Sequence, residues 1–269
     1  MSNNSSLSFT ITTSNGTFQT LKDKTFQIMP TRTRIVNYKK FKPINEPTNI
    51  LLHTGYDVRP WSQEIFNPSS YQISLIDSYI TTSKILNVKE ILIHGPDTPE
   101  RTEYLTSGLK LLKLINTTKI PFVIEMPAFC QSMFNDQYMN NKYEFIKSYF
   151  NTCISEGFNI VPDTAHLYAN GLTTKEIIEI LNIFKDNYTF IHLNGNSNPQ
   201  YKHDKHTTLT PLTGYETNKI ESSEELLSHV AKLNKICISE QKCNNLKYFT
   251  ELANKYGFKL IDIPETLII

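Results

Sequence analysis

Nine side chains of the types that bind metal ions lie at the ends of apolar runs or in the loops that follow them. They are His53, His94, Glu125, Asp163, His166, His192, Asp204, His206 and Glu240. Neutral imidazole and carboxylate groups are the usual ligands of Zn²⁺, and they also suit Mn²⁺ and Fe²⁺. A catalytic ion takes about three protein ligands, so nine residues can serve two or three ions. Such a cluster suits phosphodiester hydrolysis, because one ion acidifies a water while others neutralise the phosphate and the leaving alkoxide.

Taken singly, each of these residues has a plainer interpretation. A histidine at the end of a strand more often makes a hydrogen bond, and Glu125 or Asp163 could cap a helix. The joint count favours metal binding, because burying so many polar groups at one rim without a counter-charge is costly. His229 is not one of the nine candidate ligands.

Six apolar runs end on one of the nine residues. They are NILLH ending at 53, ILIH at 94, FVIE at 125, NIVPD at 163, YTFIH at 192 and ICISE at 240. Leu7–Thr12 and Thr25–Met29 bring the predicted strands to eight. The strand ends recur roughly every 30–40 residues, the size of a βα unit.

Segments with helical spacing separate these runs. We expect helices over 70–86, 104–114, 143–150, 173–184, 222–233 and 244–256. The second has a start signal in Thr98 and Pro99, and the fourth opens on a capping-box pattern at Thr173.

Eight βα units predict an α/β protein, a (β/α)8 TIM barrel with the metal site at the C-terminal ends of its strands. We expect one domain over residues 1–269, with residues 1–6 a disordered tail. A doubly wound open sheet is the main alternative, but the nine glycines form no GxGxxG or P-loop motif.

The formal charge of +1 excludes a generally basic protein, so binding of nucleic acid would need a local basic patch or bound cations. The N-terminus does not resemble a secretory signal, and no run of roughly 18 apolar residues predicts a membrane span. The four cysteines lack CxxC spacing and are expected to be reduced thiols. These features predict an intracellular, cytoplasmic protein, or a nuclear or virion protein if the source is eukaryotic or viral.

The chain resembles the endonuclease IV family of apurinic/apyrimidinic (AP) endonucleases, as a divergent member. The segments that carry the resemblance are VPDTAHLYANG (161–171), IHLNGN (191–196), HDKH (203–206) and IEMPA (124–128). The resemblance runs from about His53 to Glu240 and matches all nine ligand positions in order.

This resemblance implies a barrel with about three zinc ions. The first would be held by His53, His94 and Glu125. The second would share Glu125 and take Asp163, His192 and Glu240. The third would be held by His166, Asp204 and His206.

The implied activity is that of a phosphodiester hydrolase of base-excision DNA repair. A metal-bound hydroxide would hydrolyse the bond 5′ to an abasic site in double-stranded DNA, leaving a 3′-hydroxyl and a 5′-deoxyribose phosphate. A related 3′-phosphodiesterase activity is consistent with this chemistry. Glu125 and Glu240 are the candidate catalytic residues, and a monomer is expected.

The sequence departs from the family around the ligands. His94-Gly95-Pro96, Glu125-Met126-Pro127 and His192-Leu193-Asn194-Gly195 replace family patterns, and the Gly-x-His-x-Ser signature of the first strand is absent. Losses of this kind reduce metal affinity or activity roughly 10–100-fold.

DNA contacts are less clearly indicated than the metal site. The candidates are Arg32, Arg34, Tyr56, Tyr168, Tyr201 and His203. Tyr56 matches a family loop position, but Asp57 replaces the apolar residue that follows it. A solvated loop for the arginines and barrel packing for the tyrosines are the competing interpretations.

Three alternatives stay open. A sugar-phosphate isomerase or epimerase would use the same barrel with fewer ligands. A UV-damage endonuclease would be a nearer relative of the endonuclease IV family than these isomerases are. An inactive DNA-binding relative would keep the barrel and lose the chemistry.

Overall fold

The structure is a computed structural model that describes residues 4–13, 25–30, 41, 43, 45, 49–55, 57–62, 70–196, 206–207, 216–217, 219–220, 224–240 and 246–260. All eight predicted strands are present. They are β1 (Ser6–Thr13), β2 (Thr25–Pro30), β3 (Asn49–His53), β4 (Glu90–His94), β5 (Phe122–Glu125), β6 (Asn159–Val161), β7 (Phe190–His192) and β12 (Ile236–Ser239).

These strands are parallel and form a closed ring. They pair in the order β6-β5-β4-β3-β2-β1-β12-β7, and β13 (Lys259–Leu260) adds to β1 as a ninth strand. Beyond the last residues of β6, a parallel bridge joins Asp163 to His192, and the His192 amide donates to the Pro162 carbonyl at 2.9 Å. This contact connects the two ends of the sheet, so the architecture is the predicted TIM barrel.

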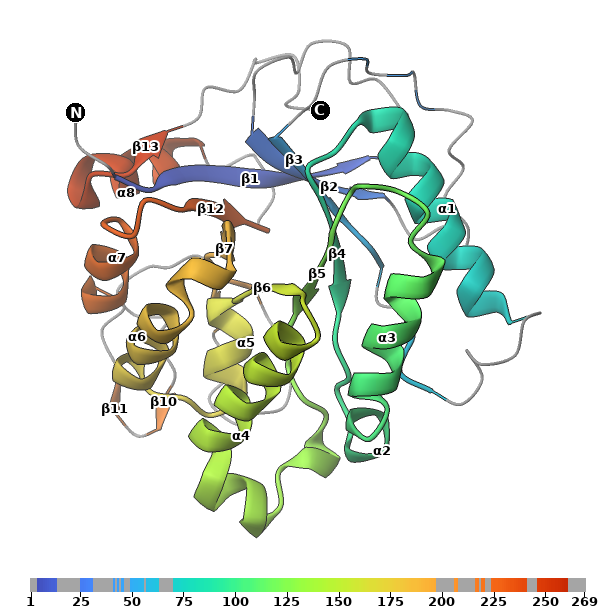
Figure 1. Cartoon of the computed structure of the whole chain (residues 1–269). Helices are drawn as coiled ribbons and strands as arrows, with labels where there is room; N and C mark the ends of the chain where they lie inside the picture. The colour runs from blue at the N-terminus through green and yellow to red at the C-terminus, as the bar shows by residue number, and fades with distance from the viewer. Residues whose placement is uncertain are drawn as a thin grey trace.

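Helices lie around the strands, as Figure 1 shows, with α1 and α3 on one side and α6, α7 and α8 on the other. They are α1 (Tyr71–Leu86), α2 (Pro99–Thr102), α3 (Leu105–Ile115), α4 (Asp136–Ser155), α5 (Thr164–Ala169), α6 (Thr174–Ile183), α7 (Glu224–Val230) and α8 (Leu246–Tyr256). Two short 3₁₀ helices, Gln131–Met133 and Lys185–Asn187, precede α4 and β7. Two small antiparallel ladders pair β8 (Gly195–Asn196) with β9 (His206–Thr207) and β10 (Glu216–Thr217) with β11 (Lys219–Ile220).

Helix starts follow the predicted local chemistry. Thr98 caps α2 with Pro99 at the first helical position, and Thr173 and Glu176 form both halves of a capping box at α6. The helix expected to run on from Pro99 is instead interrupted at Glu103 and Tyr104, which separate α2 from α3. The six residues of α5 were not predicted, since so short a helix shows little periodicity.

The inside of the barrel is filled by a layer of fully buried apolar side chains, one from each of six strands. They are Leu51, Leu92, Val123, Val161, Phe190 and Ile238. Intervening strand residues such as Ile50, Ile93 and Ile191 belong to the larger core that also includes helix residues. Strands buried on both faces explain why the sequence shows continuous apolar runs there.

The predicted tail over residues 1–6 is wrong for its last three residues. Ser5 is buried, its hydroxyl donates to the Val230 carbonyl at 2.7 Å, and Ser6 begins β1. Residues 1–3 lie outside the described part of the chain. None of the described helices has the length and apolar character needed to cross a bilayer.

Candidate metal centre

Six of the nine candidate ligands lie two residues beyond a member of the interior layer. They are His53, His94, Glu125, Asp163, His192 and Glu240. Successive side chains of a strand point to opposite faces, so a residue two positions further on points to the same face. Each of the six therefore points into the barrel, one step closer to the C-terminal ends of the strands.

The Glu125 carboxylate lies at the centre of the six. Its Oε1 lies 2.7 Å from His192 Nδ1, and its Oε2 lies 3.1 Å from His94 Nε2 and 3.4 Å from His53 Nε2. A fourth imidazole, that of His166, has Nδ1 3.4 Å from Glu125 Oε1. One buried carboxylate thus contacts four histidine rings.

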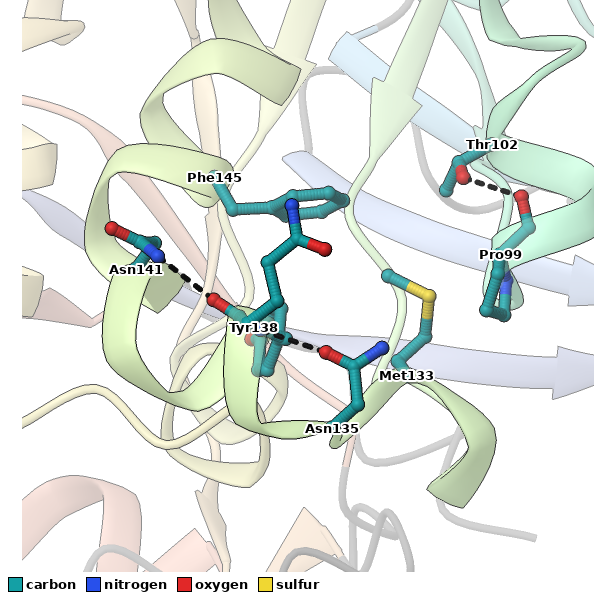
Figure 2. A pocket seen from close by; sticks show the side chains of 8 residues that line it. Pro99, Thr102, Met133, Asn135, Tyr138, Asn141 and Phe145 are labelled. Carbon is teal, nitrogen blue, oxygen red and sulfur yellow. Dashed lines mark hydrogen bonds between the residues drawn. The ribbon is translucent and has the colours of Figure 1, made fainter.

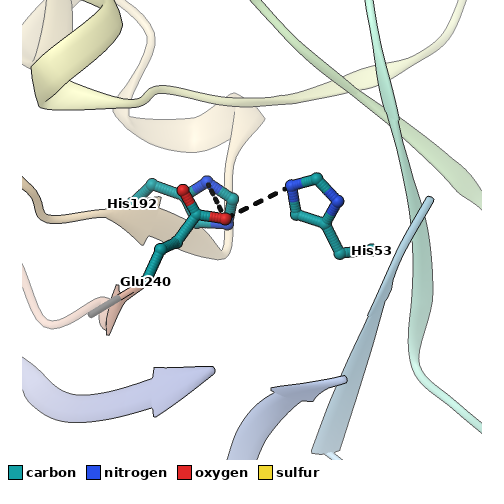
Figure 3. Close-up of side chains that lie close together, drawn as sticks. All are labelled: His53, His192 and Glu240. Atoms are coloured by element: carbon teal, nitrogen blue, oxygen red, sulfur yellow. Dashed lines mark ion pairs between the residues drawn. The ribbon is translucent and has the colours of Figure 1, made fainter. Parts of the chain in front are cut away.

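Glu240 enters the cluster from the end of β12. Its Oε1 lies 3.3 Å from His53 Nε2 and 3.8 Å from His192 Nδ1, and Figure 3 shows the carboxylate between the two rings. Asp163 Oδ2 lies 3.5 Å from the same His192 nitrogen. Its other oxygen accepts from the His166 amide at 3.0 Å and caps α5, so Asp163 serves both the cluster and the helix.

The ligand atoms form three overlapping sets, and within each set they lie within 4.8 Å of one another. The sets are His53, His94 and Glu125; Glu125, Asp163, His192 and Glu240; and His53, His192 and Glu240. The first two have the same members as two of the ligand groups that the family resemblance implies.

Hydrogen bonds to backbone carbonyls orient two of the rings. His53 Nδ1 lies 2.6 Å from the Thr54 carbonyl, and His166 Nδ1 lies 2.8 Å from the Met126 carbonyl. A carbonyl oxygen only accepts, so these nitrogens carry protons and each Nε2 is left as the potential ligand atom. Metal-binding histidines are commonly oriented in this way.

Burial and mutual contact shift the protonation of the cluster. Burial disfavours a charged His192, but Glu125 and Glu240 outweigh it and raise its pKa well above the usual value. Burial also disfavours a charged His53, but the same two carboxylates, which lie 3.3 and 3.4 Å from its Nε2, outweigh that effect and raise its pKa. Burial lowers the pKa of His94 to about 3, so its ring is neutral. Although burial acts in the opposite direction, the charge of His192 helps to hold the pKa of Glu125 well below its usual range.

The donor set fits a divalent cation. Glu125 Oε2 is fully buried and, among the described residues, has no hydrogen-bond partner, even though two imidazole nitrogens lie close to it. A buried carboxylate oxygen without a partner is costly. A cation coordinated by this oxygen and the two nitrogens would remove that cost, and imidazole with carboxylate is a usual zinc environment.

The third predicted ligand group is only partly described. His166 is fully buried on α5. The backbone of His206, in β9, pairs with that of Asn196, in the strand that follows β7 closely. Asp204 lies outside the described residues, and nothing is described of the His206 side chain.

Two residues that the sequence analysis did not select hold the ligands in place. The Asn194 amide donates to Asp163 Oδ2 at 3.0 Å and to Glu240 Oε2 at 3.4 Å, while its oxygen accepts from the Glu240 amide at 2.9 Å. Gln27, on β2, lies between His192 and Glu240. The only signal for Asn194 was its place two residues after His192, and no pattern singled out Gln27.

The structure corrects one predicted DNA contact. Tyr168 is 1% exposed, packs in the core and shares a 2.9 Å hydrogen bond with the Thr174 hydroxyl, so it cannot reach a bound duplex. The other candidates, Arg32, Arg34, Tyr56, Tyr201 and His203, lie outside the described residues.

A separate pocket of about 330 Å³ is lined by residues of α2, the first 3₁₀ helix and α4 (Figure 2). No charged side chain lines it. Asn135 accepts from the Tyr138 amide, Asn141 donates to the Gln137 carbonyl, and Thr102 donates to the Pro99 carbonyl. These polar groups are used within the helices, so the pocket shows no arrangement for catalysis.

No family model matches this sequence, and no curated protein shows significant similarity to it. Solved structures do match. Endonuclease IV from Thermus thermophilus matches with a TM-score of 0.61 and 15% identity, covering 93% of this chain and 99% of the other. A xylose isomerase domain protein from Planctomyces limnophilus gives 0.58 and 14%, and the apo form of 3-keto-D-glucoside 4-epimerase from E. coli gives 0.54 and 10%; both cover 94% of this chain and 99% of the other.

These likenesses establish the fold. The chain is a TIM-barrel protein, and the solved structures whose fold it shares include an endonuclease IV and a xylose isomerase domain protein. It carries a buried cluster of metal-ligand type at the C-terminal ends of its strands.

Proposed function

We propose that this protein is a zinc-dependent AP endonuclease of base-excision repair, which hydrolyses the phosphodiester 5′ to an abasic site in double-stranded DNA. A 3′-phosphodiesterase activity of the same site is part of the proposal. The observation that carries it is the central position of Glu125, each of whose two oxygens lies near two histidine rings. That arrangement suits a carboxylate shared by two ions.

One ion would be held by His53, His94 and Glu125, and a second by Glu125, Asp163, His192 and Glu240. His166 with Asp204 and His206 would hold a third. When bound, the ions would lower the pKa of a water and stabilise the charge that develops on the phosphate. Glu125 would keep the two sets at a fixed separation. Glu240, which directly follows β12, would orient the attacking water, and Asn194 holds its carboxylate in place.

A sugar isomerase or epimerase is the second candidate. The set Glu125, Asp163, His192 and Glu240 has the four ligands that one ion needs, and the sequence analysis expects such enzymes to use fewer ligands than the nuclease. An epimerase is also among the structures that share the fold. The third ligand group, drawn from His166 and the HDKH segment, favours the nuclease.

Incision of a defined duplex tests the proposal. A labelled duplex with one tetrahydrofuran abasic analogue is incubated with zinc-loaded protein, with chelator-treated protein and beside the undamaged duplex. We expect a single cut 5′ to the analogue, a 3′ end that a polymerase can extend, and loss of activity in chelator. Zinc-loaded protein that leaves the duplex intact would refute the proposal. If that protein still bound the duplex, it would be an inactive DNA-binding relative.

A further inference from the structure

Gln27 is a polar residue in an apolar part of the barrel. In the register between β2 and β3 it pairs with Leu51, a member of the interior apolar layer, and its side chain is fully buried. Burying a carboxamide is costly unless its hydrogen bonds are made. An apolar residue would fill the space at lower cost, so the contacts of Gln27 indicate its role.

Those contacts join two candidate metal ligands. Gln27 Oε1 lies 2.6 Å from His192 Nε2, and Gln27 Nε2 donates to Glu240 Oε1 at 2.9 Å. An ionised carboxylate only accepts, so the amide nitrogen must face Glu240. The amide oxygen must then face His192, and a proton must lie on His192 Nε2.

Because Nε2 bonds Gln27, Nδ1 is the ring nitrogen that faces the cluster. With its proton on Nε2, His192 presents Nδ1 to Glu125, 2.7 Å away, and to Asp163, 3.5 Å away. His53 is oriented the opposite way, with Nδ1 bonded to a carbonyl and Nε2 facing the carboxylates. The two rings differ because the nitrogen that points away from the cluster bonds a backbone carbonyl in His53 and the amide oxygen of Gln27 in His192.

We propose that Gln27 is a positioning residue of the metal centre: it fixes His192 as a ligand through Nδ1 and holds Glu240 Oε1 beside it. The inference rests on the proposed metal binding, though not on the identity of the substrate. It gives β2, which contributes no candidate ligand, a specific part in the site.

Two substitutions separate positioning from packing. Gln27→Met keeps the length of the side chain and removes both hydrogen bonds, whereas Gln27→Glu keeps an acceptor for His192 and loses the donor to Glu240. Gln72→Met is the matched control, because the Gln72 carboxamide bonds the Arg59 amide at 2.7 Å and the Asp57 carbonyl at 2.9 Å without contacting a ligand. Circular dichroism checks that each variant is folded.

The readouts are zinc affinity, measured by competition with a chromogenic chelator, and the slowly exchanging imidazole N–H proton in NMR spectra, assigned with His192→Ala. We expect Gln27→Met to lose the His192 N–H signal and to bind zinc roughly 10–100-fold more weakly. Gln27→Glu should retain the signal, and Gln72→Met should match the wild type in both readouts.

Wild-type zinc affinity and an unchanged N–H signal in Gln27→Met would overturn the positioning role of Gln27 but not the proposed metal centre. A wild-type protein that binds no zinc would instead overturn the proposed metal centre, and the inference with it.

Discussion

Asp163 and His192 close the barrel and also lie side by side in the cluster. Their backbones form the bridge between β6 and β7, and Asp163 Oδ2 lies 3.5 Å from His192 Nδ1. The neighbouring junctions have three or four paired residues, as between β5 and β6, whereas the described pairing here is one bridge. A cation bound by both side chains would therefore strengthen the junction with the least backbone pairing.

Zinc should slow hydrogen exchange at this junction. The His192 amide, which donates to Pro162, is expected to gain protection on zinc binding, because opening the junction would then break metal contacts. The Ile91 amide, bonded to Pro121 at the other end of the barrel, is the control. Residue-resolved exchange by NMR would contradict the idea if both amides changed equally or neither changed.

Zinc should also stabilise the whole fold. A ligand that binds only the native state stabilises it by about 4 kcal/mol at a free concentration 1,000 times its Kd, which corresponds to a rise in Tm on the order of 10 °C for a domain of this size. Mg²⁺ at the same concentration is the comparison, since it prefers oxygen ligands. Calorimetric scans with equal shifts for both ions would argue against a zinc site.

Glu125→Ala should abolish incision at the abasic analogue, because it removes the carboxylate common to two of the three ligand sets. His229→Ala is the control. His229 is on α7, outside the cluster, and should retain nearly full activity. Single-turnover kinetics would measure both variants, and wild-type turnover in Glu125→Ala would refute the bridging role.

The reactivity of Cys130 should depend on Asp97. The Cys130 thiol lies 3.4 Å from Asp97 Oδ2, and burial together with the negative charge of that carboxylate raises its pKa. The thiolate is the reactive form, so Asp97→Asn should lower this pKa and speed alkylation near pH 8 several-fold, on the order expected for removing a like charge.

Peptide mass spectrometry after iodoacetamide treatment measures that rate, with Glu144→Gln as an exposed control. Cys153 and Cys237 are buried, and burial raises the pKa of each thiol well above its usual value, so both should stay unmodified in the native protein. An unchanged rate at Cys130 in Asp97→Asn would contradict the electrostatic effect.

The strands and the positions of the ligands were predictable for one physical reason. Each interior residue such as Leu51 is followed two positions later by a candidate ligand such as His53, so apolar runs and polar ends were both visible in the sequence. Gln27 was not predictable, since one glutamine in a strand carries no period and its two partners lie 165 and 213 residues away along the chain.

Tyr168 is the reverse case: the sequence favoured it as a site residue, but it does not lie in the site. Its nearness in sequence to His166 favoured a role in the site, but residues two apart on a helix do not share a face, and this side chain packs in the core. The closure of the barrel through Asp163 could not be predicted from the sequence either, because it depends on strand tilt and register.

The zinc content of the purified protein shows whether the cluster around Glu125 is a metal centre. Protein purified without chelators is analysed by inductively coupled plasma mass spectrometry beside Glu125→Ala. We predict about three zinc ions per chain in the wild type and at most one in the variant, in which the two ligand sets that share Glu125 are broken. A folded wild-type protein with less than one divalent ion per chain, even after dialysis against zinc, would show that this cluster is not a metal centre.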